Sequence, residues 1–111
     1  MNYIGSIDQG TTSTRFILFN ERGESVSNYQ LEHKQYYPQP GYVEHDPEEI
    51  WKNTKTVIRE AIRKSGINVK DLKGLGITNQ RETIIPFDPT TGEVLHNAIV
   101  WQDLRASSIV D

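Results

Sequence analysis

The stretch Asp8-Gln9-Gly10-Thr11-Thr12-Ser13-Thr14-Arg15 decides how this chain folds and what it can bind. It joins two short apolar segments, residues 3–7 and 16–19, which are rich in aromatic and β-branched residues and therefore predict two strands. The stretch between them is then the turn of a β-hairpin. It carries a carboxylate, a glycine, four consecutive hydroxyls and an arginine.

These residue types are suited to holding phosphate. Hydroxyls and turn amides donate to phosphate oxygens, and the Arg15 guanidinium can pair with them in a fork. Gly10 lets the backbone approach a ligand closely and adopt a positive φ. Asp8, at a strand end, can hold Mg²⁺ directly or through water. The same residues are also common in plain polar turns, so both interpretations are open at this point.

The whole chain has 111 residues, about the size of one domain, and a net charge of -3. Its 12 basic and 15 acidic residues are mixed without a basic stripe, so we expect neither nucleic acid nor a membrane surface as a partner. The absence of cysteine excludes a disulfide scaffold and a thiolate metal site. No leader or membrane-spanning pattern is present, which favours a cytoplasmic protein.

A third strand follows the hairpin. Residues 20–23 predict a tight turn, and residues 24 to about 34 predict an edge strand because their apolar side chains are sparse. Three strands joined by short turns predict an antiparallel meander. Residues 35–45 are irregular, with two prolines, a glycine and three tyrosines. The tyrosines either pack this loop down or form a surface for a partner or ligand.

A helix begins at Pro47. Asp46 is its predicted N-cap, Glu49 completes a capping-box spacing, and Gly66 provides the C-cap. The predicted apolar face comprises Ile50, Trp51, Thr54, Val57, Ile58, Ala61 and Ile62. The helix dipole already explains Glu48 and Glu49 in the first turn, so we assign them no catalytic role.

Residues 72–78 predict a buried strand in which Gly74 and Gly76 allow close backbone approach. No dinucleotide fingerprint follows this glycine pair and no GxxxxGK[ST] motif occurs, which excludes the Rossmann and P-loop interpretations.

Further short strands are predicted at residues 83–87, 94–95 and 98–101, with a turn at residues 88–92. Residues 102–111 begin a helical pattern, and the chain stops inside it. The helical side consists of Leu104, Ser108 and Ile109. Because that apolar face has nothing to pack on, and only 35% of the residues are hydrophobic, we expect a piece of a longer protein.

Three later segments complete a recognisable pattern with the hairpin. They are residues 40–51 (PGYVEHDPEEIW), 77–83 (ITNQRET) and 97–103 (NAIVWQD). In this order and spacing the chain resembles the N-terminal segment of the glycerol kinases in the FGGY carbohydrate kinase family. The resemblance covers essentially all 111 residues. The hairpin alone is shared by the wider actin-like superfamily, the segment around Arg81 is more specific, and Ile84 and Phe87 depart from the pattern.

The resemblance implies an α/β fold. It is a partial ribonuclease-H-like domain of the actin-like ATPase superfamily, with an antiparallel three-stranded meander, a helix and further strands. Residues 1–111 would form the N-terminal part of the first FGGY kinase domain, with the remainder of that domain and all of domain two absent. The complete protein would phosphorylate glycerol to sn-glycerol 3-phosphate. Its cofactors would be ATP/ADP and Mg²⁺, its partners glycerol and the rest of the kinase chain, and a homo-oligomer is compatible with this.

The resemblance also implies the site residues. For the nucleotide, Thr11, Thr12 and Ser13 match positions that line the phosphates, and Arg15 matches one near the β-phosphate. Asp8 matches the position facing Mg²⁺.

For the substrate, Arg81 and Glu82 match residues that hydrogen-bond glycerol, and Trp101 matches one that packs on its carbons. Thr11 adjoins this substrate site as well. The family's catalytic base is an aspartate beyond residue 111, so no catalytic residue is expected here. His33, His45 and His96 follow no pattern and are interpreted as structural or surface residues.

Two alternatives stay open. One is a related FGGY kinase for another polyol or ketose, which a substrate panel on the complete protein would separate. The other is a stand-alone, non-catalytic module that binds a nucleotide or a partner protein. The length of the open reading frame past Asp111 separates this module from both kinases.

Overall fold

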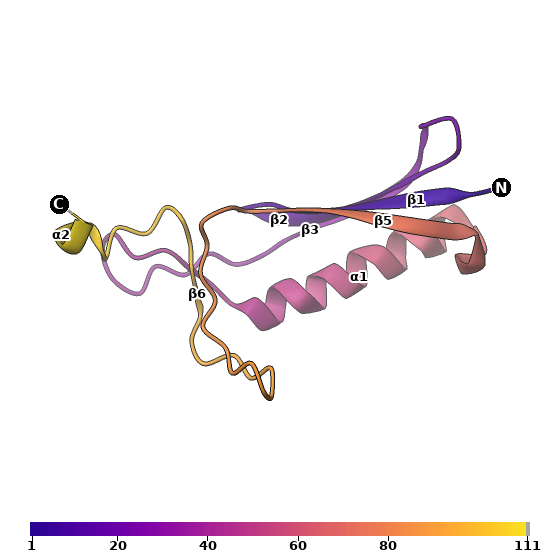
Figure 1. The fold of residues 1–111 in the computed structure, drawn as a ribbon. Coiled ribbons are helices and arrows are strands. Elements are labelled where there is room, and N and C mark those ends of the chain that lie inside the picture. The colour runs from indigo at the N-terminus through magenta and orange to yellow at the C-terminus, as the bar shows by residue number, and fades with distance from the viewer. Residues whose placement is uncertain (111) are drawn as a thin grey trace.

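A computed structural model describes residues 1–110 and shows a four-stranded mixed sheet with one long helix on one face (Figure 1). Strands β1 (Tyr3–Gln9), β2 (Ser13–Phe19) and β3 (Ser25–Glu32) form an antiparallel meander. Strand β5 (Leu72–Asn79) lies parallel to β1, which gives the order β3-β2-β1-β5. The predicted α/β fold, with its meander, helix and further strands, is confirmed.

Helix α1 (Pro47–Ser65) has the predicted caps. The Asp46 side chain accepts a hydrogen bond from the Glu48 amide at 3.0 Å, and Gly66 ends the helix at φ 73°. The expected capping box is absent, since the Glu49 carboxylate accepts instead from the Lys34 amide at 3.2 Å and joins the helix start to the chain after β3.

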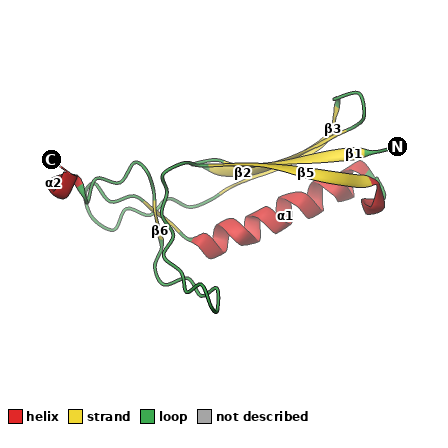
Figure 2. Cartoon of the chain, in the orientation of Figure 1, coloured by secondary structure: helices red, strands yellow, loops and turns green. Residues whose placement is uncertain are grey.

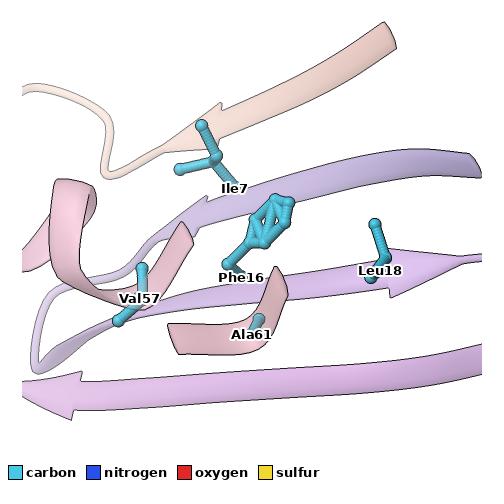
Figure 3. Packing of buried hydrophobic residues seen from close by; sticks show 5 residues of the cluster. All are labelled: Ile7, Phe16, Leu18, Val57 and Ala61. Carbon is cyan, nitrogen blue, oxygen red and sulfur yellow. The ribbon is translucent and has the colours of Figure 1, made fainter. Parts of the chain in front are cut away.

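The core lies between α1 and the sheet. Figure 3 shows Val57 and Ala61 of α1 beside Phe16 and Leu18 of β2, with Ile7 of β1 completing the cluster. Apolar burial of this kind stabilises a domain by roughly 25 cal/mol per Å².

Two predicted features of this packing differ in the structure. Trp51 was predicted on the apolar face but is 58% exposed, because it lies about 100° around the helix from Ile50, beyond the sheet. Gly10 was predicted to use a positive φ, but it does not. Its amide closes the hairpin by donating to the Ser13 carbonyl at 2.9 Å, and a Cβ on Gly10 would lie 3.2 Å from that oxygen.

The prediction that β5 is a buried strand is wrong for the described part of the chain. Ile77 is 70% exposed, because β5 forms the edge of the sheet and α1 packs on β2 and β3 instead. A Cβ on Gly74 or Gly76 would meet no atom within 4 Å. The close approach occurs at Gly5, where an added Cβ would overlap the Phe16 ring and the Leu75 side chain.

The chain after β5 is mostly loop, as Figure 2 shows in green. Residues 83–87 and 94–95 were predicted as strands but make only the isolated bridges Ile84↔Ile99 and Phe87↔Val94. Pro86 lacks an amide hydrogen, so the ladder cannot continue through it. The turn predicted at residues 88–92 is present, with a 2.7 Å hydrogen bond from the Gly92 amide to the Asp88 carbonyl.

A second, two-stranded sheet pairs β4 (Glu44–His45) with β6 (Ala98–Ile99), so the strand predicted at residues 98–101 is shorter than expected. Helix α2 (Ser107–Val110) is a single turn, and residues 102–106 are not helical. The side chains of Asp103 and Arg105 explain this, because both are held by the segment that contains β4. Asp111 lies outside the described residues. No helix among residues 1–110 is long and apolar enough to cross a membrane.

Candidate functional site

The candidate site lies at the carboxyl ends of β1 and β5. These strands are parallel, so the turn after β1 and the loop after β5 emerge at the same edge of the sheet. The Gln80 side-chain amide, 3.5 Å from the Gly10 carbonyl, joins the two. In α/β folds, ligands bind at such an edge.

Asp8 and Arg15 face each other across the hairpin. They are register partners on β1 and β2, and the Arg15 Nη2 atom lies 3.7 Å from the Asp8 Oδ2 atom. Both side chains are 45% exposed, so this is a loose, solvated ion pair that a charged ligand can replace.

The four turn hydroxyls do not share one environment. Thr12 is exposed, and the Ser13 hydroxyl accepts from the Gln30 amide at 2.7 Å. The Thr11 hydroxyl accepts from the Trp101 indole at 3.0 Å. Thr14 points inward and donates to the Gln9 Oε1 atom at 2.6 Å, so its hydroxyl is structural.

The indole contact brings together two predicted site residues that are 90 positions apart in the chain. Trp101 is 52% exposed, which leaves much of its ring free for a ligand. The segment that carries it is fixed by the side chains of Asp103 and Arg105. Arg105 donates to the Glu44 and Asp103 carboxylates, each at 2.7 Å, and Asp103 also accepts from the Val43 amide at 2.7 Å.

This carboxylate–guanidinium cluster is a structural clamp. Hydrogen bonds from Arg105 hold the pKa values of Glu44 and Asp103 below their usual range. Hydrogen bonds to Asp103 and Glu44 in turn raise the pKa of Arg105. The guanidinium also lies 3.9 Å from the centre of the Tyr42 ring. All three charges therefore stay ionised at neutral pH, and the segment leading from Trp101 is anchored to the loop before α1.

Arg81 and Glu82 form the tip of the loop after β5. Both are exposed, and within residues 1–110 neither makes an ion pair or a side-chain hydrogen bond. Glu82 has φ 61°, and it is the one non-glycine residue with a positive φ in the described part of the chain. Strained backbone of this type gathers at ligand sites.

A partly buried series of hydrogen bonds beside the site was not predicted from the sequence. The Gln80 Nε2 atom lies 3.2 Å from the His45 Nδ1 atom, and the His45 Nε2 atom lies 2.7 Å from the Gln35 Oε1 atom. Gln35 donates to the Thr11 carbonyl at 3.1 Å, and the His33 ring contacts the same oxygen at 2.8 Å. The two histidines are therefore structural, which is one of the two roles expected for them.

His45 is fully buried, and its ring meets the His33 ring edge-on with the centroids 4.4 Å apart. Burial, and secondly the charge of His33, lower the pKa of His45 to about 4. The imidazole is therefore neutral at physiological pH. No local pattern marked this histidine, because its partners lie 10 and 35 positions away.

The described residues contain no group of three or more His, Cys, Asp or Glu that could hold a metal ion. A single exposed carboxylate, Asp8, stands at the turn. That donor set fits Mg²⁺ bound with a nucleotide, because Mg²⁺ in such sites takes one or two carboxylates and completes its shell with phosphate oxygens and water.

The sheet order and the polar turn are consistent with a partial domain of the actin-like ATPase fold, and comparisons with solved structures place the chain among sugar kinases of that fold. The crystal structure of Plasmodium falciparum glycerol kinase with ADP matches with a TM-score of 0.90 and 43% identity over 99% of this chain and 22% of that one. A ligand-bound xylulose kinase from Lactobacillus acidophilus matches with a TM-score of 0.90 and 27% identity over 99% of this chain and 22% of that chain.

The sequence comparisons resolve the family. Residues 3–111 match the N-terminal domain of the FGGY family of carbohydrate kinases, and the chain belongs to that family. It is similar to the glycerol kinase of Azorhizobium caulinodans, with 56% identity over 97% of this chain and 22% of the relative. It is likewise similar to the glycerol kinase of Clavibacter michiganensis, with 57% identity over 98% of this chain and 22% of the relative. The chain therefore spans about a fifth of the length of these curated relatives.

Proposed function

We propose that the complete protein carrying this chain transfers a phosphoryl group from ATP to glycerol and produces sn-glycerol 3-phosphate. One observation carries the proposal. A hydroxyl-rich turn suited to phosphate lies beside an unpaired Arg81–Glu82 loop suited to a polyol, and the Trp101 indole bonds to the turn. The two curated relatives described above, at 56% and 57% identity, are named glycerol kinases. Because ATP is the donor, the proposal includes a cytoplasmic location.

The described residues would form the N-terminal part of the first kinase domain. The rest of the protein would supply the remainder of that domain and the whole of the second domain. Two observations support this. The chain spans 22% of its curated relatives. Apolar side chains on β5 and in the following loop, including Leu75, Ile77 and Ile84, are at least half exposed and need a cover.

In this proposal the turn holds the nucleotide. The hydroxyls and amides of residues 11–13 would donate to phosphate oxygens, and Arg15 would leave Asp8 to pair with the β-phosphate region. The Asp8 carboxylate, once released, would hold Mg²⁺ directly or through water. When bound, Mg²⁺ neutralises phosphate charge during transfer.

The opposite loop would hold glycerol. Arg81 supplies donors and Glu82 supplies acceptors, so the pair can fix two hydroxyls of the triol. The exposed face of Trp101 would pack on the carbon chain and exclude water. The free 3-hydroxyl oxygen then attacks the γ-phosphorus in line with the leaving ADP oxygen. Its proton would pass to a base outside this chain.

The test is a substrate panel on the complete protein. Glycerol, a ketose such as xylulose and an acid sugar such as gluconate are each assayed with ATP and Mg²⁺, and the phosphorylated product is identified. We expect kcat/KM for glycerol to exceed the others by about 100-fold or more, because longer sugars do not match its polar contacts. Preference for a ketose, or nucleotide binding without any transfer, would instead support one of the two alternatives.

A further inference from the structure

A partly buried series of hydrogen-bonded side chains joins the phosphate-binding turn to the Arg81–Glu82 loop. It runs from the Thr11 carbonyl to Gln35, from Gln35 to His45, and from His45 to Gln80. His45 stands at its centre and is fully buried. The two ends belong to the two sides of the candidate site.

The direction of each hydrogen bond in this series follows from the backbone carbonyls at its two ends. A backbone carbonyl only accepts, so the Gln80 amide nitrogen must face the Gly10 carbonyl and hence the His45 Nδ1 atom. His45 then accepts at Nδ1 and donates from Nε2 to the Gln35 oxygen at 2.7 Å. The Gln35 nitrogen is left facing the Thr11 carbonyl, which is the arrangement observed.

The loop that carries Arg81 and Glu82 is fixed on both sides by the same glutamine. The Thr83 hydroxyl donates to the Gln80 Oε1 atom at 2.9 Å, so Gln80 and Thr83 bracket the two exposed residues. The Gln80 nitrogen is held from behind by His45. Removing the His45 acceptor would take away one of the hydrogen bonds that hold this loop, while its exposed side chains stay intact.

We propose that His45 is a positioning residue of this kinase: its imidazole, bonded on both ring nitrogens, sets the distance between the turn that binds phosphate and the loop that binds the acceptor substrate. The inference rests on the proposed function. An apolar residue could fill the same space. It could not accept a hydrogen bond from Gln80 in the loop after β5, nor donate one to Gln35, which bonds to the turn after β1. Misplacement of two substrates by about 1 Å can cost 100-fold in rate.

The experiment compares variants of the complete protein by kcat, by KM for glycerol and for ATP, and by melting temperature. His45→Phe keeps a ring but removes both hydrogen bonds, and Gln80→Leu removes the loop end of the chain. His45→Gln restores one donor and one acceptor. His96→Phe is the matched control, since His96 is exposed and its one side-chain hydrogen bond within residues 1–110 is with the neighbouring Asn97 carbonyl.

We expect His45→Phe and Gln80→Leu each to lower kcat by about 10- to 100-fold in folded enzyme. His45→Gln should recover part of that loss, and His96→Phe should match the wild type. Because both variants break the same link, the double variant should lose little more than either single one.

The inference is overturned if both single variants keep kcat within about threefold of the wild type, or if their losses multiply in the double variant. If His45→Phe does not fold, Gln80→Leu, Gln35→Leu and their double variant replace it, and the same limits on kcat test the inference. A complete protein that phosphorylates a different polyol or ketose overturns the proposed function alone. The kcat values of the variants relative to the wild type, measured with that substrate, then test the role of His45. A protein without kinase activity overturns both.

Discussion

Glu82 combines a strained backbone with a side chain that nothing in residues 1–110 engages. A positive φ at a non-glycine residue costs of order 1 kcal/mol or more and persists only where the surroundings enforce it. The bond between Thr83 and Gln80 supplies that constraint, because it closes the loop around this position. Arg81 and Glu82 are thus presented to solvent at the tip of a loop whose two ends are held together.

If these two residues bind glycerol, each contributes a charge-assisted hydrogen bond of roughly 1.5–3 kcal/mol. Arg81→Ala and Glu82→Gln should therefore lower kcat/KM for glycerol by about 10- to 150-fold in the complete protein. The KM for ATP should change little, because the nucleotide is assigned to the other turn. Steady-state kinetics with each substrate varied provides the measurement. Glu93→Gln, an exposed residue in a distant turn, is the control, and unchanged glycerol kinetics in both variants would refute the assignment.

The buried imidazole of His45 predicts a pH dependence of stability. Its pKa falls from 6.5 in the unfolded chain to about 4 in the folded one, so the unfolded state binds more protons between these values. Its contribution is present above pH 6.5 and is lost as the pH falls through this window. The carboxylates Glu44 and Asp103, with lowered pKa values, act in a separate window below about pH 4.

Urea unfolding of residues 1–111 between pH 4 and 8 measures this effect. The free energy of unfolding should decline below about pH 6.5 in the wild type, and the decline should be smaller in His45→Phe. Identical pH profiles for the two proteins would show that His45 does not titrate as described.

The sequence suggested candidate site residues but not the hydrogen bonds that connect them. Asp8, Thr11, Arg81 and Trp101 were selected from motifs, and the structure brings Thr11 and Trp101 into contact. The inward orientation of Thr14 was missed because alternation along β2, rather than the row of hydroxyls, decides which way it points. The link through His45 could not be predicted, since it depends on tertiary positions of residues far apart in the chain.

Among the elements, those with strong local signals were predicted correctly. The meander follows from short turns between alternating strands, and α1 follows from its caps and periodic apolar residues. The segments after β5 carry only short apolar runs, and in these the pairing depends on neighbouring strands rather than on propensity. Pro86 interrupts the strand expected at residues 83–87. The hydrogen bonds of Asp103 to Val43 and of Arg105 to Glu44 prevent the helix expected from residue 102.

The packing of β1 against β2 gives a sharp test with an internal control. A methyl at Gly5 would overlap the buried Phe16 ring, which has no room to move, so Gly5→Ala should destabilise the fold by about 1–3 kcal/mol. Gly74→Ala on the neighbouring strand meets no atom within 4 Å and should be close to neutral. The measurement is the urea concentration at the unfolding midpoint of each variant of residues 1–111. Equal midpoints for the two variants would contradict the described core.

Viewed as a whole, residues 1–110 form an elongated body, 54 × 29 × 21 Å, with the meander and α1 at one end and the loops around β4 and β6 at the other (Figure 1). The candidate site lies between these parts, at the carboxyl ends of β1 and β5. Apolar side chains on β5 and its following loop remain exposed. These features match a chain that spans about a fifth of its curated relatives.

We therefore predict that residues 1–111 alone do not catalyse transfer, and that they either self-associate or are only marginally stable. An open half-site cannot exclude water or align two substrates, and the uncovered apolar surface favours association. The measurement is ATP-dependent formation of glycerol 3-phosphate by the purified chain, with light scattering alongside and the complete protein as the positive control. Turnover on the order of 1 per second from a clean monomer would contradict this expectation.

The most direct test of the central claim is a crystal structure of the complete protein with glycerol, ADP and Mg²⁺. The account predicts glycerol hydroxyls within hydrogen-bond distance of Arg81 and Glu82, with the Trp101 ring against the carbons. It also predicts phosphate oxygens on residues 11–13 and Mg²⁺ reached by Asp8 directly or through water. Glycerol bound elsewhere, with the Arg81–Glu82 loop still solvated and the Asp8–Arg15 pair intact beside the nucleotide, would contradict the account.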